Sequence, residues 1–248
     1  MGSFKSALEK HFKGAMHEHE FVTHSVEVLK QYGFTPENTI PAVGLCRDEI
    51  CRSFSREVEA AWSPSFDFSS LAGMNFLGKT GFGAFHAHSP NPGGKQRYVY
   101  FGLAHIAIDA KGEIGKCARR NRDGESKACG ALVALQGELD QIELGDPKEF
   151  LFAGYEAKDM DQTMLKLRLV PEIEDLHKCD LVALTKLARE VIHKDLCGMA
   201  HDTVPKGSDY AVFTGVQIHG PEEQQLVWPG EYFVGLQGAQ FPDVKPQK

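Results

Sequence analysis

The sequence predicts an α/β fold in which helices flank a largely parallel central sheet. Residues 40–45 form a short apolar run, and residues 97–109 are rich in the aromatic and β-branched side chains typical of strands. The first run is followed by a helical pattern at residues 50–61, and a helix is expected directly after Cys129. Alternation of strands with helices favours parallel pairing, because a parallel connection must cross over the sheet.

The remaining segments fit the same architecture. Residues 6–32 show helical spacing and end before Gly33, and residues 114–122 are expected to return as a hairpin arm. No repeat or linker interrupts the chain, so we expect one domain over residues 1–248, with residues 1–33 as an N-terminal helical segment packed on it. Further helices are expected at 159–169 and 176–196, and further strands at 150–155, 209–219 and 231–240.

The composition excludes several classes of protein. A chain of 248 residues with 42% hydrophobic and 25% charged residues is typical of a soluble globular protein. The net charge of −7 argues against a nucleic-acid partner, and we interpret the one basic cluster, residues 119–122, as a solvated loop. No apolar run of about 18 residues predicts a membrane span. Six cysteines are too few for a disulfide scaffold and favour a reducing compartment with functional thiols.

The segment 45–52 concentrates reactive side chains between a predicted strand and a predicted helix. Cys46 follows the strand, where a helix N-terminus favours a thiolate. Asp48 and Arg52 are four residues apart, so they share one helix face, and the guanidinium would keep the carboxylate ionised. Arg47 is the alternative partner of Asp48. The simpler interpretation is an ordinary buried thiol beside a surface ion pair.

A second cysteine has the same context, which favours a metal site. Cys129 also precedes a helix, and His105 lies within the strongest predicted strand. Because strand ends converge on one crevice in such a sheet, two thiolates and an imidazole would suit Zn²⁺ with a fourth position open to water. His86 and His88 are the alternative imidazole ligands. If His105 binds the metal, they would suit the pocket wall or a proton path.

One glycine-rich segment matches the pattern of a phosphate-binding loop. Gly73, Gly78, Lys79 and Thr80 have the required spacing, although no β-branched strand precedes them. Close packing of the glycine backbone beside a pocket is the alternative use of this segment. Nucleotide binding is therefore one of the hypotheses for the function.

Several short motifs resemble known families. Cys46-Arg47-Asp48 is similar to the Cys-x-Asp-x-Arg element of β-class carbonic anhydrases, although the arginine of that element would fall at Ile50. His105 with Cys129-Gly130 is similar to its His-x-x-Cys-Gly element, split here by an inserted hairpin. Over residues 20–240 the chain more closely resembles the algal limiting-CO2-inducible protein B family, which is related to the θ-class carbonic anhydrases. The motifs are Cys46-Arg47-Asp48-Glu49-Ile50, Ser70-Leu71-Ala72-Gly73-Met74, Leu77-Gly78-Lys79-Thr80-Gly81, His105-Ile106-x-Ile108-Asp109 and Cys129-Gly130-Ala131-Leu132.

The resemblance implies a β-carbonic-anhydrase-like fold, a zinc site, usually a homodimer, and a role in inorganic-carbon acquisition. It also suggests the chloroplast stroma if a transit peptide has been removed, and the cytoplasm otherwise. We expect a zinc-dependent carbonic anhydrase in which zinc-bound hydroxide attacks CO2. Asp48 would accept a hydrogen bond from the nucleophile, and Arg52 would keep Asp48 charged.

The CO2 pocket is expected near Phe82, Phe85 and Leu103, which are apolar. The alternative function is a catalytically weak zinc protein that binds or responds to CO2 or bicarbonate. In that case Asp48 itself would close the fourth metal position.

Overall fold

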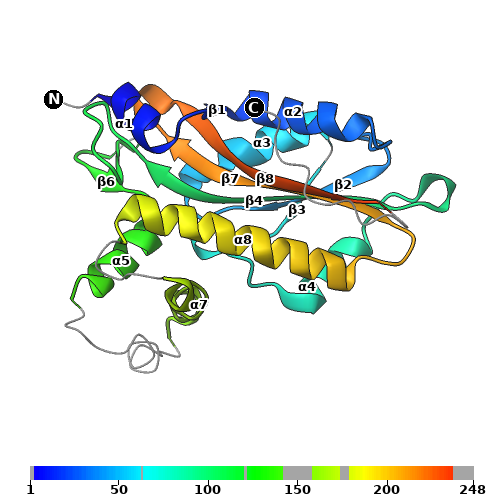
Figure 1. The fold of residues 1–248 in the computed structure, drawn as a ribbon. Coiled ribbons are helices and arrows are strands. Elements are labelled where there is room, and N and C mark those ends of the chain that lie inside the picture. The colour runs from blue at the N-terminus through cyan, green and yellow to red at the C-terminus, as the bar shows by residue number, and fades with distance from the viewer. Residues whose placement is uncertain (1–2, 63, 120–121, 142–157, 174–178, 237–248) are drawn as a thin grey trace.

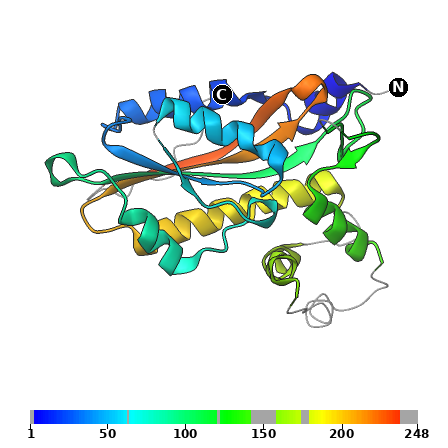
Figure 2. The ribbon, with the colours of Figure 1, turned by 180° about the vertical axis from the view of Figure 1, so that it is seen from behind.

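The computed structural model describes residues 3–62, 64–119, 122–141, 158–173 and 179–236. A six-stranded sheet crosses the centre of the molecule, with helices on both faces (Figures 1 and 2). Helices α2 (Glu18–Lys30) and α3 (Arg52–Ala61) cover one face, and α8 (Leu181–Thr203) runs across the other. The predicted α/β architecture is therefore confirmed.

The central strands of the sheet pair in parallel, as predicted. β2, β3, β4 and β7 are mutually parallel, whereas β8 is antiparallel to β7 and β1 is antiparallel to β8. Every residue of β2 is buried, as expected of a parallel strand covered on both faces. In spatial order the strands are β1 (Met16–His17), β8 (Gln225–Gly235), β7 (Asp209–His219), β4 (Arg97–Ala107), β2 (Thr39–Gly44) and β3 (Phe66–Asp67).

Two connections leave the carboxyl edge of this sheet and lead to helices. β2 leads through a single 3₁₀ turn, Glu49–Cys51, into α3. β4 leads through a small hairpin of β5 (Lys116–Cys117) and β6 (Ser126–Lys127) into α5 (Gly130–Leu139). The hairpin arm predicted at 114–122 is therefore much shorter than expected. Both predicted cysteine-to-helix elements end at the same edge of the sheet.

Helix α8 packs closely on the sheet because β4 has a glycine at the contact. A Cβ atom at Gly102 would meet Leu196 and Ile192 of α8. The helix begins after Asp180, whose carboxylate accepts a hydrogen bond of 2.8 Å from Ala183 N. The predicted start at residue 176 lies outside the described residues. Two further helices, α7 (Met160–Leu169) and α4 (Gly78–His86), lie beyond the same face (Figure 1).

The N-terminal prediction of one continuous helix over residues 6–32 is wrong. The segment forms α1 (Phe4–His11), then β1 at the edge of the sheet, then α2. Gly14 adopts a φ of 86° in the turn that precedes β1, and Glu20 caps the start of α2 by accepting from His17 N at 3.0 Å. The strands predicted at 150–155 and, in part, at 231–240 lie outside the described residues.

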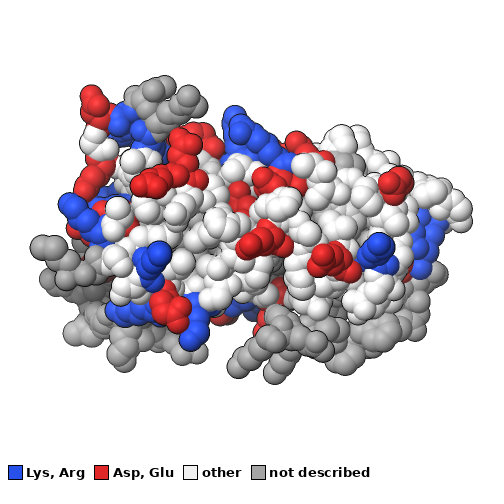
Figure 3. Space-filling model, turned by 90° about the horizontal axis from the view of Figure 1, so that it is seen from above, with Lys and Arg blue, Asp and Glu red and all other residues white. Residues whose placement is uncertain are grey.

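The described helices include none that combines the length and apolar character needed to span a membrane. On the face seen from above in Figure 3, acidic and basic side chains are interspersed.

Candidate metal centre

The end of β2 holds Cys46 and Asp48 in fixed positions. Cys46 forms a parallel bridge with Ser70, and Arg47 N donates to Ser70 O at 3.2 Å. Asp48 then caps the following 3₁₀ turn by accepting from Ile50 N at 3.4 Å. The cysteine therefore lies at a strand end and the aspartate at a helix start, as the sequence predicted.

Cys129 reaches the same place from the end of β4. Ala107 N donates to Ala128 O at 3.1 Å, and Ala128 N donates to Gly115 O at 3.0 Å. Cys129 then caps α5, accepting from Val133 N at 3.0 Å. The inserted hairpin between His105 and Cys129 thus returns the second cysteine to the strand that carries the histidine.

The structure brings Cys46, His105 and Cys129 together as a buried group. Their sulfur and nitrogen ligand atoms all lie within 4.8 Å of one another. His105 Nε2 is buried and has no hydrogen-bond partner among the described residues, although Nδ1 has one. An orphaned imidazole nitrogen beside two sulfurs fits Zn²⁺, which prefers these donors and commonly takes three protein ligands at catalytic sites.

The two sulfurs already interact without a metal. The hydrogen bond donated by the Cys129 thiol lowers the pKa of Cys46 to about 4, against the opposing effect of burial. The same hydrogen bond, with burial, raises the pKa of Cys129. All six cysteines are free thiols, so no disulfide competes for these ligands. One sulfur is thus readily a thiolate, the form that binds metals.

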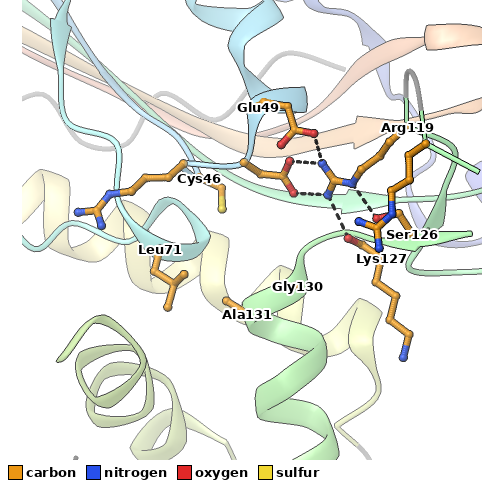
Figure 4. Close-up of a pocket in the computed structure, with 11 residues that line it drawn as sticks. Cys46, Glu49, Leu71, Arg119, Ser126, Lys127, Gly130 and Ala131 are labelled. Atoms are coloured by element: carbon orange, nitrogen blue, oxygen red, sulfur yellow. Dashed lines mark hydrogen bonds and ion pairs between the residues drawn. The ribbon is translucent and has the colours of Figure 1, made fainter. Parts of the chain in front are cut away.

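Arg119 holds Asp48 beside this group through two parallel hydrogen bonds (Figure 4). Arg119 Nη1 donates to Asp48 Oδ1 and Nη2 donates to Oδ2, each at 2.7 Å. The guanidinium is itself positioned, since Nε donates to Ser126 Oγ at 2.7 Å and Nη2 donates to Lys127 O at 3.2 Å. Arg119 also pairs with Glu49. The β5–β6 hairpin therefore delivers the arginine that orients Asp48.

This pairing corrects the predicted role of Arg52. Among the described residues, neither Arg52 nor Arg47 forms an ion pair with Asp48; Arg47 Nη1 donates instead to Asp161 Oδ2 at 2.6 Å. Arg52 lines a second groove, which does not include Arg119. The i, i+4 argument fails because Asp48 lies in the cap before the turn, where it does not share the face of α3.

Arg119 keeps Asp48 ionised. Burial alone would raise the pKa of this carboxyl, but the hydrogen bonds and charge of Arg119 lower it to about 2. Bidentate pairing with an arginine also restricts the carboxylate in space. Asp48 is therefore an acceptor with a fixed orientation.

A pocket of about 480 Å³ opens over these residues (Figure 4). It is lined by Cys46, Asp48 and Arg119, and on its apolar side by Leu71 and Ala131. Sequence reasoning missed Arg119, which belongs to the basic cluster interpreted as a solvated loop. Arg119 lies ten residues before Cys129, on the segment that leads to this predicted ligand, and this position was the available signal that it belongs to the site. The other lining residues are Arg47, Glu49, Arg122, Ser126, Lys127 and Gly130.

The pocket residues predicted on α4 and β4 do not line this pocket. Phe82, Phe85 and Leu103 are almost fully buried and belong to the hydrophobic core. His86 is also buried, with Nε2 2.6 Å from the Tyr100 hydroxyl, and burial lowers its pKa to about 4. His88 packs against Phe66. Neither histidine belongs to a candidate metal group in the described parts of the chain, so the structure favours His105.

The glycine-rich segment also has a structural explanation. Gly73 adopts a φ of 78°, and a Cβ atom there would collide with the carbonyl oxygen of Leu103 in β4. The segment leading to Gly73 is a 3₁₀ turn, Leu71–Gly73, where a phosphate-binding loop would follow a strand. Close backbone packing thus accounts for this glycine.

Two solved structures have a fold similar to that of this chain. The crystal structure of the limiting CO2-inducible protein LCIB is similar, with a TM-score of 0.77 and 31% sequence identity over 94% of this chain and 95% of that chain. The crystal structure of PtLCIB4, a homolog of LCIB, gives a TM-score of 0.80 and 24% identity over 97% and 99% of the two chains. A search of curated proteins gave no match.

Most of the sequence also matches the model of one protein family. Residues 15–235 match the family of limiting CO2-inducible proteins B/C, beta carbonic anhydrases. This range contains the cysteine, histidine and aspartate of the candidate site together with every strand of the central sheet. The chain therefore belongs to the limiting CO2-inducible protein B/C family of beta carbonic anhydrases.

Proposed function

We propose that this protein is a zinc-dependent carbonic anhydrase that interconverts CO2 and bicarbonate in inorganic-carbon acquisition. The observation that carries the proposal is the buried group of Cys46, His105 and Cys129 beside an aspartate that Arg119 keeps ionised. Family membership supports the same class of reaction.

Zinc held by these three residues would supply a hydroxide nucleophile near neutral pH by lowering the pKa of a water molecule. Asp48 contributes orientation. An ionised carboxylate only accepts hydrogen bonds, so Asp48 would accept one from the O–H of the nucleophile and leave a lone pair directed at the carbon of CO2. Asp48 is the catalytic residue in this proposal, and Arg119 is the residue that positions it.

The Asp48–Arg119 pair also argues for an open site. For Asp48 to become a fourth metal ligand, as in the alternative binding-protein hypothesis, it would have to give up at least part of the bidentate contact. Such charge-assisted pairs are among the stronger hydrogen bonds in proteins. The conformation seen here therefore favours catalysis over a closed, responsive site.

The pocket has suitable chemistry for both reactants. Leu71 and Ala131 offer an apolar wall for neutral CO2, and Lys127 adds positive charge near Arg119 (Figure 4). Arg122 is a further cation in the lining. Positive charge lining a cleft attracts an anion such as bicarbonate. The homodimer expected from the family is a separate proposal that sedimentation of the zinc-loaded protein tests.

The test combines metal analysis with stopped-flow measurement of CO2 hydration. We expect one zinc per chain and a hydration rate well above that of buffer. Absence of catalysis from protein with verified zinc content would contradict the enzyme hypothesis and favour the binding protein.

A further inference from the structure

A chain of hydrogen bonds lies behind His105, on the side away from the two cysteines. His105 Nδ1 is 3.1 Å from His219 Nε2, and His219 Nδ1 is 2.6 Å from Gln225 Oε1. His219 is the last residue of β7, and Gln225 is its register partner at the start of β8. His105 and His219 are both buried, so water does not substitute for these bonds. The sheet itself therefore builds this chain.

The hydrogen bonds in this chain have a definite direction. The Gln225 carbonyl oxygen only accepts, so the proton between it and His219 resides on His219 Nδ1. A neutral imidazole carries a single N–H, and His219 is enclosed by protein with 3% of its surface exposed. His219 Nε2 is therefore an acceptor, and His105 Nδ1 must carry the proton that it accepts.

This direction leaves His105 Nε2 with a lone pair and no proton. Nε2 is the same atom that is buried without a hydrogen-bond partner in the described structure. We propose that His219 is a positioning residue that fixes His105 in its metal-binding tautomer, with Gln225 setting the direction of the hydrogen bonds. The inference rests on the proposed zinc site and adds two residues to it.

A third neighbour supports this assignment. Cys51 Sγ lies 3.7 Å from His219 Nε2, and a thiol is a weak hydrogen-bond donor. The single lone pair of Nε2 accepts from His105, and the more distant thiol is compatible with this direction. Cys51, His105 and His219 also lie close enough to form a candidate metal group. The 3.1 Å separation of the two imidazole nitrogens is an ordinary hydrogen-bond length, so we assign Cys51 and His219 as support for the first group.

The reverse direction would have a clear cost. A proton on His219 Nε2 would be donated to His105 Nδ1 and would force the His105 proton onto Nε2, where it blocks metal binding. Partners of this kind typically change metal affinity by about 10- to 100-fold when they are removed. Loss of the acceptor at position 219 should therefore weaken zinc binding without removing any ligand.

The tautomer is tested first in the metal-free protein. Nitrogen NMR of ¹⁵N-histidine-labelled protein, with the His105 signals assigned by their loss in His105→Ala, should show the proton on Nδ1. In His219→Leu this preference should disappear. A proton found on His105 Nε2 in the parent protein would overturn the inference whatever the zinc affinity.

Zinc affinity, measured by competition with a chromophoric chelator, gives the second test. We expect the dissociation constant of His219→Leu to rise about 10- to 100-fold. His219→Gln should restore affinity to within a few-fold, because its amide oxygen can occupy the position of Nε2 and accept from His105. His193→Leu, which replaces a half-buried histidine of α8 that contacts Thr214, is the matched control and should bind like the parent.

Parental affinity in both variants at position 219 would contradict the positioning role while leaving the proposed function intact. Failure of the parent itself to bind zinc would instead contradict the proposed function. If His219→Leu does not fold, the NMR result on the parent and the affinity of His219→Gln decide the question. Equal losses of affinity in the leucine and glutamine variants would overturn the acceptor argument.

Discussion

Arg119 donates one hydrogen bond to each carboxylate oxygen of Asp48, both at 2.7 Å, across 71 positions of sequence. The pair is largely buried, with 14% of the arginine side chain and 11% of the aspartate side chain exposed. Burial makes the contact stronger than a surface ion pair, because solvent screens it less. The contact also joins the β5–β6 hairpin to the end of β2.

Replacement of Arg119 by methionine should reduce CO2 hydration at least about tenfold while zinc content stays near parental, because Asp48 loses its charge partner and its fixed orientation. The hydration rate of Arg119→Lys should lie between those of the parent and Arg119→Met, since lysine retains the charge but cannot form the bidentate contact. Stopped-flow rates and metal analysis of the same samples provide the measurement.

Arg52→Met is the matched control for this prediction. It removes the arginine that sequence spacing favoured and should retain the parental rate. If the Arg52 variant loses activity and the Arg119 variant does not, the pairing assigned to Asp48 is wrong.

The three proposed ligands give a second prediction. Cys46→Ser, Cys129→Ser and His105→Ala should each lose zinc, because a hydroxyl or a methyl group replaces a soft or imidazole donor. His86→Ala and His88→Ala should retain one zinc per chain. Metal analysis after gel filtration is the measurement, and full zinc content in any of the first three variants would remove that residue from the ligand set.

The contrast between Asp48 and its partner shows what the sequence can predict. Cys46, His105 and Cys129 were predicted because each lies at or within an element whose pattern is clear, and parallel strands converge at one edge. Arg119 was missed because its contact depends on the path of the hairpin from β4 to α5, which local spacing does not specify.

The packing of α4 was missed for a similar reason. The apolar character of Phe82 and Phe85 favours a CO2 pocket, but both rings pack against Phe68, which follows β3, and against Tyr100 of β4. Which apolar residues face a cavity depends on tertiary packing that periodicity does not contain. The predicted N-terminal helix is interrupted at Gly14, which has a positive φ. The spacing of the apolar residues does not indicate this interruption.

Glu18 gives a prediction about pH and stability. Burial raises the pKa of this glutamate to about 7, although Gln217 donates to it at 2.6 Å. The folded-state pKa lies above the unfolded one, so the contribution to stability is complete below about pH 4.5 and is lost as the pH rises through about 7. Glu18→Gln does not ionise and should avoid this loss.

The free energy of unfolding, measured with urea, should therefore increase in Glu18→Gln relative to the parent as the pH rises. We expect a relative gain on the order of 2–3 kcal/mol between about pH 5 and about pH 8.5. Glu27→Gln, at an exposed position of the same helix, should show no such trend. A pH-independent difference between parent and Glu18→Gln would contradict the assigned pKa.

Gly73 and Gly83 separate a packing role from a phosphate-binding role. Gly73→Ala should destabilise the fold by at least about 1–3 kcal/mol, because alanine is strained at positive φ and its Cβ meets the backbone of β4. Gly83→Ala, inside α4 with no atom near the new Cβ, should stabilise by about 0.5–1 kcal/mol. Thermal unfolding measures both, and saturable binding of ATP or GTP with Mg²⁺ would contradict the packing interpretation.

The central claim is that Asp48 orients the nucleophile for attack on CO2, and Asp48→Asn tests it most directly. The amide can donate where the carboxylate only accepts, so it presents the wrong hydrogen bond to the nucleophile. Stopped-flow proton release on mixing CO2 with zinc-loaded parent and variant is the measurement. We predict equal zinc content and a rate at least about 100-fold lower in the variant, within the range typical of general acid–base and hydrogen-bonding groups. A parental rate in Asp48→Asn would show that Asp48 and Arg119 form only a structural ion pair.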